Sequence, residues 1–318
     1  MPLELGIVGP PNAGKTSLFN ALTHAGAAVT PYETVGGKPN LGVVPVPDGR
    51  LSRLADVVGS AKATAATFRV VDPPGMRAPQ LGELRKADAL IAVLDGFSPG
   101  AEAQSGLESL RLELVVADRD HVERRLERVR SQAKSGDPKL RDEVQQLEQV
   151  LAHVDAGLPL GDYAAPLPPE LEPLTTKPLV AIENGPGGID LALEAELAEM
   201  SEEEAAPFRE GPAALDELLD RLRRELGLLT FFTANENEAH SWLLRSGQTA
   251  LDAAATIHSD MARGFIRAEV VPVEDLAAAG SYAEAARRGI QRLEGRDYRV
   301  QDGDVLAIRF GPSQAARR

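Results

Sequence analysis

The sequence contains no cysteine among its 318 residues. Without thiols, the protein has no disulfides, no thiolate metal sites and no cysteine nucleophile, and redox switching through a thiol is excluded. Histidine is also scarce, with five in total, and none stands at a metal-ligand spacing from another. Thiol-dependent enzymes and disulfide-stabilised domains are therefore excluded.

Long hydrophobic runs are also missing. No apolar stretch approaches the roughly 18 residues of a membrane-spanning helix. The first residues, Met1–Glu4, lack the basic start and apolar centre of a signal peptide. Hydrophobic content of 43% and charged content of 26% are ordinary for a globular protein. We therefore expect a cytoplasmic protein with no membrane partner.

Positive charge is in short supply. Lys and Arg number 34 against 48 Asp and Glu, which gives a formal net charge of −14. The summed field of such a chain repels polyanions, so indiscriminate binding along nucleic-acid backbones is disfavoured. Local basic patches can still override this repulsion.

The most informative stretch is Gly9–Thr16, GPPNAGKT, which fits the pattern G-x-x-x-x-G-K-[ST]. It follows an apolar run, Leu3–Val8, and precedes a segment of helical character, which is the strand, loop and helix order that a phosphate-binding loop requires. The glycines let backbone N–H groups converge, Lys15 adds a full charge, and the Thr16 hydroxyl suits a magnesium ion. The alternative is a glycine-rich turn without a ligand, in which a lysine among glycines would have little structural purpose.

A second pattern supplies a carboxylate for the same ion. Phe68–Asp72 is a strand-like run, and D-x-x-G follows from Asp72 to Gly75. Asp72 would lie on the metal side, and the Gly75 N–H would meet the γ-phosphate. The alternative is a simple turn built from Asp, Pro and Gly. Thr34 lies between the two motifs, where switch-type nucleotide hydrolases place a threonine that completes the magnesium shell.

Apolar runs at 3–8, 40–46, 67–71 and 89–94 alternate with helical segments, which predicts an α/β domain with a parallel-type sheet. From Leu107 to Val154, apolar residues follow two heptad-like seams with a Ser-Gly-Asp-Pro turn between them. We expect an inserted antiparallel helical hairpin there. Two ordinary surface helices of the α/β domain are the alternative.

The rest of the chain predicts a return path and a second domain. Six prolines between 157 and 178 indicate a linker or an irregular return path, after which 179–182 resumes a strand. From Leu228 onward, short β-type runs dominate, and Gln301–Asp304 resembles a hairpin turn between two strands. We expect a small, separate α+β domain.

The chain resembles the YchF family, the Obg-like ATPases within the translation-factor class of GTPases. The stretches that carry the resemblance are LGIVGPPNAGKTSLFNALTHAG, PNLGVVPVPDGRLSRLADVV, TIHSDMARGFIRAEVVPVEDL and GRDYRVQDGDVLAIRF. The resemblance implies an α/β P-loop NTPase domain with an inserted helical hairpin, followed by an α+β β-grasp domain of the ubiquitin-like TGS type. The domain boundaries that we expect are 1–106 and 158–227 for the NTPase domain, 107–157 for the hairpin and 228–312 for the TGS domain.

The resemblance also implies Mg²⁺-dependent hydrolysis of GTP or ATP, coupled to association with the ribosome or ribosomal RNA, by a monomer. It assigns magnesium ligation to Thr16, Thr34 and Asp72, and base binding to Asn184. The phosphate-binding residues that it implies are Gly9, Asn12, Ala13, Gly14, Lys15, Thr16, Ser17 and Gly75. No residue is assigned as catalytic. Met76 stands where other GTPases carry a water-orienting glutamine, so slow hydrolysis is expected.

The chain departs from the family pattern on the base side. The family reads its base with N-x-x-E, whereas the corresponding stretch here runs from Asn184 to Gly187 and lacks the carboxylate. Loss of a charged hydrogen-bond partner is worth roughly 1.5–3 kcal/mol, about 10- to 100-fold in affinity. The loop after D-x-x-G is short and proline-bound, and a strand and helix expected after Asn184 are missing.

Two functions follow. The first is a slow nucleoside triphosphatase with weak base preference. The second is a non-hydrolysing adaptor that keeps the loop as a fold element and binds the ribosome or RNA through the hairpin and the TGS domain.

Overall fold

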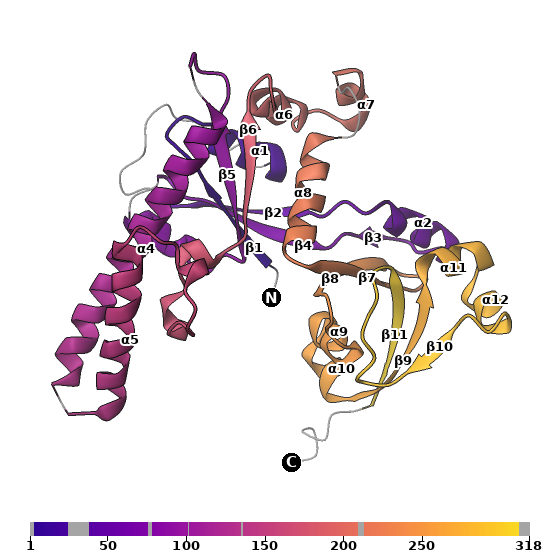
Figure 1. Cartoon of the computed structure of the whole chain (residues 1–318). Coiled ribbons are helices and arrows are strands. Elements are labelled where there is room, and N and C mark those ends of the chain that lie inside the picture. Colours follow the sequence, from indigo (N-terminus) through magenta and orange to yellow (C-terminus); the bar gives the residue numbers. More distant parts are fainter. Residues whose placement is uncertain are drawn as a thin grey trace. The chain divides into compact units, whose positions relative to one another are not determined.

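The computed structural model describes residues 3–24, 38–75, 78–100, 102–134, 136–208 and 213–311 (Figure 1). The chain forms two compact units. The N-terminal unit combines Pro2–Val44 with Arg69–Ala214, and the C-terminal unit combines Pro45–Phe68 with Leu215–Arg318. Among the described residues, no helix combines the length and the apolar character needed to cross a membrane.

Within the described residues, the N-terminal unit contains a five-stranded sheet in the order β2-β4-β1-β5-β6. Strand β1 lies parallel to β5, and β5 lies parallel to β6. β5 is apolar along almost its whole length because helices cover both faces of such a sheet. The strands are β1 (Leu3–Val8), β2 (Asn40–Pro45), β4 (Thr67–Asp72), β5 (Ala89–Asp95) and β6 (Leu179–Asn184).

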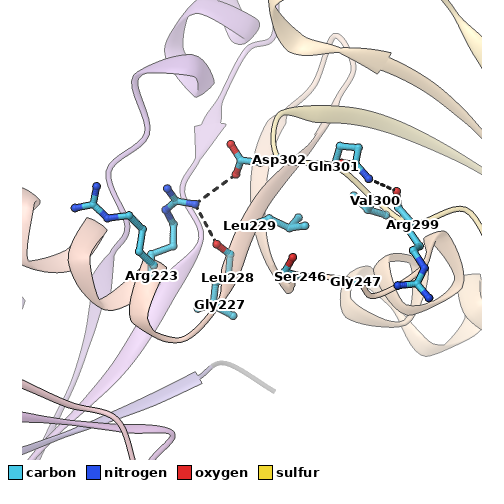
Figure 2. Close-up of a pocket in the computed structure, with 11 residues that line it drawn as sticks. Arg223, Gly227, Leu228, Leu229, Ser246, Gly247, Arg299, Val300, Gln301 and Asp302 are labelled. Atoms are coloured by element: carbon cyan, nitrogen blue, oxygen red, sulfur yellow. Dashed lines mark hydrogen bonds and ion pairs between the residues drawn. The ribbon is translucent and has the colours of Figure 1, made fainter.

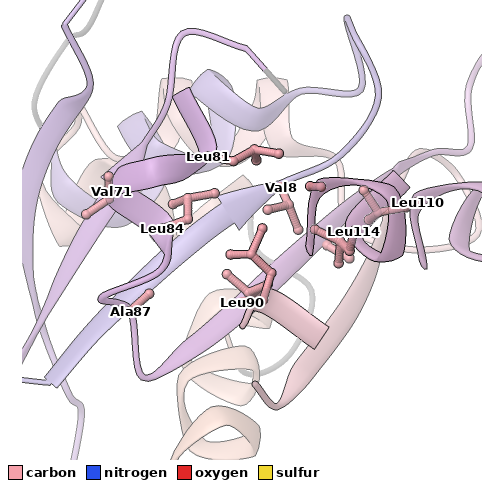
Figure 3. Packing of buried hydrophobic residues seen from close by; sticks show 11 residues of the cluster. Val8, Val71, Leu81, Leu84, Ala87, Leu90, Leu110 and Leu114 are labelled. Atoms are coloured by element: carbon pink, nitrogen blue, oxygen red, sulfur yellow. The ribbon is translucent and has the colours of Figure 1, made fainter. Parts of the chain in front are cut away.

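Helices pack on this sheet through a continuous apolar core, part of which Figure 3 shows. Leu90 of β5 lies beside Leu84, and both are fully buried together with Leu110 and Leu114. The helices of the unit are α1 (Lys15–Thr23), α3 (Ala78–Leu84), α4 (Ala103–Ala133), α5 (Pro138–Asp155), α6 (Leu191–Leu197) and α7 (Glu202–Ala205). The α/β domain predicted from the alternating runs is confirmed.

α4 and α5 form the antiparallel helical hairpin that the heptad seams predict (Figure 1). The first half of α4 packs on the sheet through Leu110 and Leu114. Its second half pairs with α5, because Val122 and Leu126 share a buried cluster with Leu147. One 31-residue helix therefore belongs to both the sheet core and the hairpin.

The proline-rich segment returns along the hairpin in three short 3₁₀ turns, Leu160–Asp162, Pro169–Leu171 and Leu174–Thr176. Asp118 of α4 is 1% exposed and fixes this path. Its carboxylate accepts hydrogen bonds from the Leu174 and Thr175 backbone N–H groups, at 2.9 Å each, and from the Arg85 guanidinium at 2.7 Å. The segment is thus an irregular return path rather than a free linker.

The C-terminal unit is α+β. Its described strands form a mixed sheet in the order β10-β9-β11-β7-β8-β3. β7 and β8 are antiparallel neighbours, as are β9 and β11, whereas β11 and β7 are parallel. The strands are β3 (Ala63–Thr64), β7 (Leu228–Ala234), β8 (Ala239–Arg245), β9 (Phe265–Pro272), β10 (Arg292–Glu294) and β11 (Asp304–Phe310). The helices are α2 (Gly49–Val58), α8 (Ala214–Glu225), α9 (Ala250–Ile257), α10 (Ser259–Arg263), α11 (Val273–Ala279) and α12 (Tyr282–Arg287).

Residues 45–68 belong to this unit although they lie between two strands of the N-terminal sheet. Leu54 of α2 is buried with Phe232 and Val271 of the C-terminal sheet. β3 adds to the same sheet, because Ala63 pairs with Ala239. The expected domain boundaries place this segment in the nucleotide domain, and the difference arises because an amphipathic helix does not encode which core it will join.

The hairpin predicted at Gln301–Asp304 is wrong. The chain before this turn is not a strand, and β11 begins only at Asp304. The turn is instead held by carboxylates. Asp304 accepts hydrogen bonds from the Gln301 N–H and the Tyr298 hydroxyl, and Asp302 accepts one from the Thr230 N–H. These hydrogen bonds fix the turn so that β11 runs between β7 and β9. In the described sheet, β11 therefore does not fold back to pair with Tyr298–Val300.

Candidate phosphate and metal site

The loop Gly9–Gly14 connects β1 to α1 in the conformation that a phosphate cradle needs. Gly9, Asn12 and Gly14 have φ angles of 148°, 62° and 99°. A side chain at Gly9 would meet the Val93 carbonyl at 2.3 Å, and one at Gly14 would meet the Asn184 amide nitrogen at 2.3 Å. Both glycines are therefore required by the backbone and by its neighbours.

The start of α1 is suited to an anion. Gly14 occupies the N-cap position, no side chain in the described part of the chain caps the helix, and its first turn has no acidic residue. The positive end of the helix dipole therefore faces the loop, and no acidic residue of the first turn neutralises it. The Lys15 ammonium donates to the Gly9 and Pro10 carbonyls at 2.9 and 2.8 Å, which folds it back over the same loop. Ser17 follows in the first turn and is half-buried.

Asp72 lies at the end of β4 and is 2% exposed. Its Oδ2 accepts hydrogen bonds from the Thr16 hydroxyl at 2.9 Å and from the Asn40 amide at 3.0 Å. Its Oδ1 is buried and finds no partner among the residues that the structure describes. Burial raises the pKa of the Asp72 carboxyl, against the lowering effects of the Asn40 and Thr16 hydrogen bonds and of the Lys15 charge.

An orphaned carboxylate oxygen beside a threonine hydroxyl fits a hard divalent cation. Mg²⁺ prefers oxygen ligands and usually binds through one or two protein groups together with water and phosphate oxygens. The unused Oδ1 of Asp72 is the kind of buried acceptor that calls for an ion or water. The donor set of Thr16 and Asp72 therefore fits magnesium. Thr34, the third predicted metal ligand, lies outside the described residues, as does Met76.

Asn40, the first residue of β2, is a site residue that sequence reasoning missed. The stretch PNLGVV carried part of the family resemblance, but nothing in it distinguished Asn40 as a partner of Asp72. Gly75 is buried three positions beyond Asp72 in the sequence.

Asn184 ends β6 and is 8% exposed. Its amide nitrogen donates to the Ala13 carbonyl at 2.9 Å, and its amide oxygen accepts from the Leu191 N–H at 3.1 Å. It therefore ties the β1–α1 loop to the start of α6. Within the described part of the chain, the second N–H of this amide has no acceptor, which leaves it for a ligand.

Glu183, the residue before Asn184, was also missed. Its side chain lies against the backbone at Gly96 and Gly187. A Cβ at Gly96 would lie 2.5 Å from the Glu183 carboxylate, and a Cβ at Gly187 would lie 3.0 Å from it. Glu183 therefore fills the space that a side chain at 187 would enter. The conformation of the 185–190 loop brings Glu183 and Gly187 together. No local sequence pattern therefore indicated that Glu183 belongs to the site.

The described sheet ends at β6, and α6 follows it after the short 185–190 loop and packs against α1. This agrees with the expectation that a strand and a helix are missing on the base side.

Family models match both ends of the chain. The model described as a 50S ribosome-binding GTPase matches residues 4–134. The YchF-GTPase C-terminal model, described as a protein of unknown function, matches residues 228–311.

Whole-length relatives show the same likeness. A protein of Bacillus subtilis (strain 168) named "Ribosome-binding ATPase YchF" is 34% identical over 364 residues, covering 98% of this chain and 100% of the relative. A protein of the same name from Haemophilus ducreyi is 34% identical over 362 residues, covering 98% and 99%. The structure of the Schizosaccharomyces pombe YchF GTPase covers 96% of this chain and 97% of its own, with a TM-score of 0.75 at 22% identity, and so shares the fold. Identity of this extent along the whole chain means that the protein belongs to the YchF family.

Proposed function

We propose that this chain is a Mg²⁺-dependent P-loop nucleoside triphosphatase that binds GTP or ATP, hydrolyses it slowly and acts in association with the ribosome. The observation that carries the proposal is the Thr16–Asp72 hydrogen bond of 2.9 Å at the start of α1, with Asp72 Oδ1 buried and unpartnered among the described residues. A magnesium ion bound together with a nucleotide would be a partner for that oxygen.

Different residues of the site would bind the phosphates and the magnesium ion. Backbone N–H groups from Gly9 to Ser17 and the Lys15 ammonium would bind the phosphates, and the Gly75 N–H would meet the γ-phosphate. Thr16, Asp72 and Thr34 would hold the magnesium ion, which when bound withdraws charge from the β- and γ-phosphates. Asn40 would keep the Asp72 carboxylate oriented through its hydrogen bond of 3.0 Å.

Base selectivity is proposed to be weak. Asn184 is the proposed base-binding residue, but both ends of its amide already hold the loop and α6 together. At 187 a glycine offers only backbone, so one charged hydrogen-bond partner for the base is absent. Met76 cannot orient an attacking water, which supports slow turnover.

Association with the ribosome is proposed from the relatives, whose names describe ribosome-binding ATPases. The hairpin and the C-terminal unit are the proposed contact elements. An inserted hairpin at 107–157 and a TGS-type domain at 228–312 remain proposals, as the interaction modules of the chain.

The test is titration of fluorescent ATP and GTP against the wild type and Lys15→Ala, with Mg²⁺ and with EDTA. We expect Lys15→Ala to weaken binding of both nucleotides by about 10- to 100-fold, since the phosphates lose a charged partner. Lys62→Ala is the matched control, because Lys62 is an exposed lysine of the C-terminal unit. A preference of about a hundredfold or more for one base would contradict weak selectivity.

Phosphate release over hours separates the two candidate functions. Release above the Lys15→Ala background supports the hydrolase. Absence of both release and nucleotide binding would instead support the non-hydrolysing adaptor.

A further inference from the structure

The end of the helical hairpin contains a pocket of about 410 Å³, where the last turn of α4 meets the start of α5. Its volume falls within the range of ligand sites. None of the lining residues belongs to the phosphate and metal site. We call this surface the hairpin tip, and it is lined by Arg130, Ala133, Lys134, Arg141, Val144 and Gln145.

The hairpin tip lies on a rigid frame. Val129 of α4 and Leu147 of α5 are fully buried in the core between the two helices. Val144 packs against the same core, and the Asp137 carboxylate caps α5 by accepting a hydrogen bond from the Lys139 N–H at 2.9 Å. A partner would therefore meet an ordered backbone, so little conformational entropy is lost there on binding.

The lining combines apolar surface with positive charge. Ala133 and Val144 are partly exposed and provide the apolar part. No lining residue in the described part of the chain is acidic. The charge comes from Arg130, Lys134 and Arg141.

The three cations differ in how far they are already paired. The Arg130 guanidinium donates to the Glu148 carboxylate at 2.7 Å, so its charge is partly neutralised. Lys134 and Arg141 are exposed, and neither forms an ion pair with another described residue. These two side chains are therefore the charges that an acidic partner can neutralise.

A cationic pocket in the C-terminal unit provides a contrast (Figure 2). There the Arg223 guanidinium donates to the lining carboxylate of Asp302 at 3.4 Å, so the pocket contains a counter-charge of its own. The hairpin tip has no such carboxylate among its described lining residues. Its positive charge is therefore open to a carboxylate from another molecule.

Acidic residues around the hairpin tip favour a protein carboxylate over a nucleic acid. Asp137, Asp142 and Glu148 are exposed, lie in or next to α5, and do not line the pocket. A nucleic acid carries a negative charge at every nucleotide, so a bound strand would meet these carboxylates at an unfavourable cost. A peptide can place a single carboxylate between uncharged residues, and the planar guanidinium of Arg141 matches a carboxylate in a bidentate geometry.

We propose that the hairpin tip is a docking surface for an acidic segment of a partner protein. A Glu or Asp side chain of the segment pairs with Lys134 and Arg141, and an apolar side chain next to it packs on Ala133 and Val144. The inference goes beyond the proposed function, because it concerns a protein partner and requires neither nucleotide nor ribosome.

The experiment measures peptide binding to the full chain without nucleotide. Fluorescence anisotropy follows a fluorescein-labelled peptide of repeated Gly-Glu-Leu-Ser units, the same peptide with Gln in place of Glu, and a labelled oligouridylate. The test variant combines Lys134→Ala with Arg141→Ala. The matched control combines Arg128→Ala with Lys139→Ala, which removes the same charge from exposed residues of the two helices outside the pocket.

We expect the parent to bind the glutamate peptide more tightly than the glutamine peptide. The test variant should bind the glutamate peptide about tenfold or more weakly, as for loss of charged hydrogen-bond partners, and the control variant should bind it as the parent does. Arg141→Lys, which keeps the charge but not the planar fork, should weaken binding by less than the test variant. Unchanged thermal melting of the variants excludes unfolding as the cause.

The proposal is overturned if the glutamate peptide does not bind the parent, if the glutamine peptide binds as well, or if the control variant weakens binding as much as the test variant. It is also overturned if the test variant loses as much affinity for the oligouridylate as for the peptide, because the hairpin tip would then be a general site for polyanions. None of these outcomes bears on nucleotide binding by the β1–α1 loop, which Lys15→Ala tests separately.

Discussion

The buried Asp72 carboxylate destabilises the ligand-free protein and at the same time provides an oxygen that can bind a cation. A buried carboxylate with one oxygen unpartnered in the described part of the chain lowers the stability of the ligand-free protein, because the desolvated charge is only half satisfied. The same oxygen is what a magnesium ion requires. The feature of Asp72 that suits it to bind a cation therefore lowers the stability of the ligand-free protein.

We predict that Asp72→Asn stabilises the ligand-free protein at neutral pH, on the order of 1–3 kcal/mol, and abolishes the magnesium dependence of nucleotide binding. The amide keeps an oxygen for Thr16 and Asn40 but carries no charge. Burial raises the pKa of Asp72 in the folded state, so the folded protein binds a proton more tightly than the unfolded chain does. The stability contributed by Asp72 consequently falls as pH rises from the unfolded pKa through the raised folded value.

The advantage of Asp72→Asn should therefore be largest above the folded pKa and shrink as pH falls and the wild-type carboxyl becomes neutral. Urea unfolding of both proteins across the acid range, without nucleotide, measures this difference. An asparagine variant that is less stable than wild type at neutral pH would contradict the account.

Gly187 and Glu183 form a pair in which one residue occupies the space of the other. A carboxylate restored at 187 would have its Cβ 3.0 Å from the Glu183 carboxylate, so two acidic groups would crowd together. We predict that Gly187→Glu alone sharpens the ratio of ATP to GTP affinity only slightly. Together with Glu183→Ala, which clears the space, the ratio should change by about 10- to 100-fold.

Equilibrium titration of both nucleotides against the two single variants and the double variant gives the coupling between the positions. Additive effects of the single changes would show that Glu183 does not occupy the functional space of residue 187.

At the scale of elements, helix α2 shows the limit of local patterns. The residues between Gly49 and Val58 form an amphipathic helix, and the local pattern does not specify which core its apolar face joins. Leu54 packs into the C-terminal core against Phe232 and Val271, which lie far along the chain. The heptad seams of α4 and α5 were predictable because each helix finds its partner across a short turn.

We predict that Leu54→Ala, at a side chain 1% exposed, destabilises the C-terminal unit by about 2–5 kcal/mol, through reduced burial and a cavity. Hydrogen exchange read by mass spectrometry should show faster exchange in β7, β8 and β9 than in β1 and β5. Arg53→Ala is the control, since the Arg53 side chain is about half exposed and pairs with Glu274 at the surface. Equal loss of protection in β1 and β5 would mean that α2 stabilises both units.

For the molecule as a whole, the sequence predicted what is encoded within short stretches. The loop Gly9–Thr16, the strands around it and the helical hairpin all follow from patterns of neighbouring residues. Asn40, Glu183 and the true course of Tyr298–Val300 did not follow, because each depends on residues brought together only by the complete fold. Asp302 and Asp304 are an example. Their local sequence predicts a turn, whereas in the structure their carboxylates accept backbone hydrogen bonds that fix the start of β11.

The division of the chain into units that interrupt each other has a consequence for how the protein is made. Residues 45–68 leave the ribosome early, but the sheet that they complete is not synthesised until after Leu215. During elongation, the apolar face of α2 stays uncovered while β4, β5 and the hairpin are added. Newly made chains should therefore hold a chaperone-accessible segment for most of the time of synthesis, and the C-terminal unit can close only when β11, the last of its described strands, has emerged.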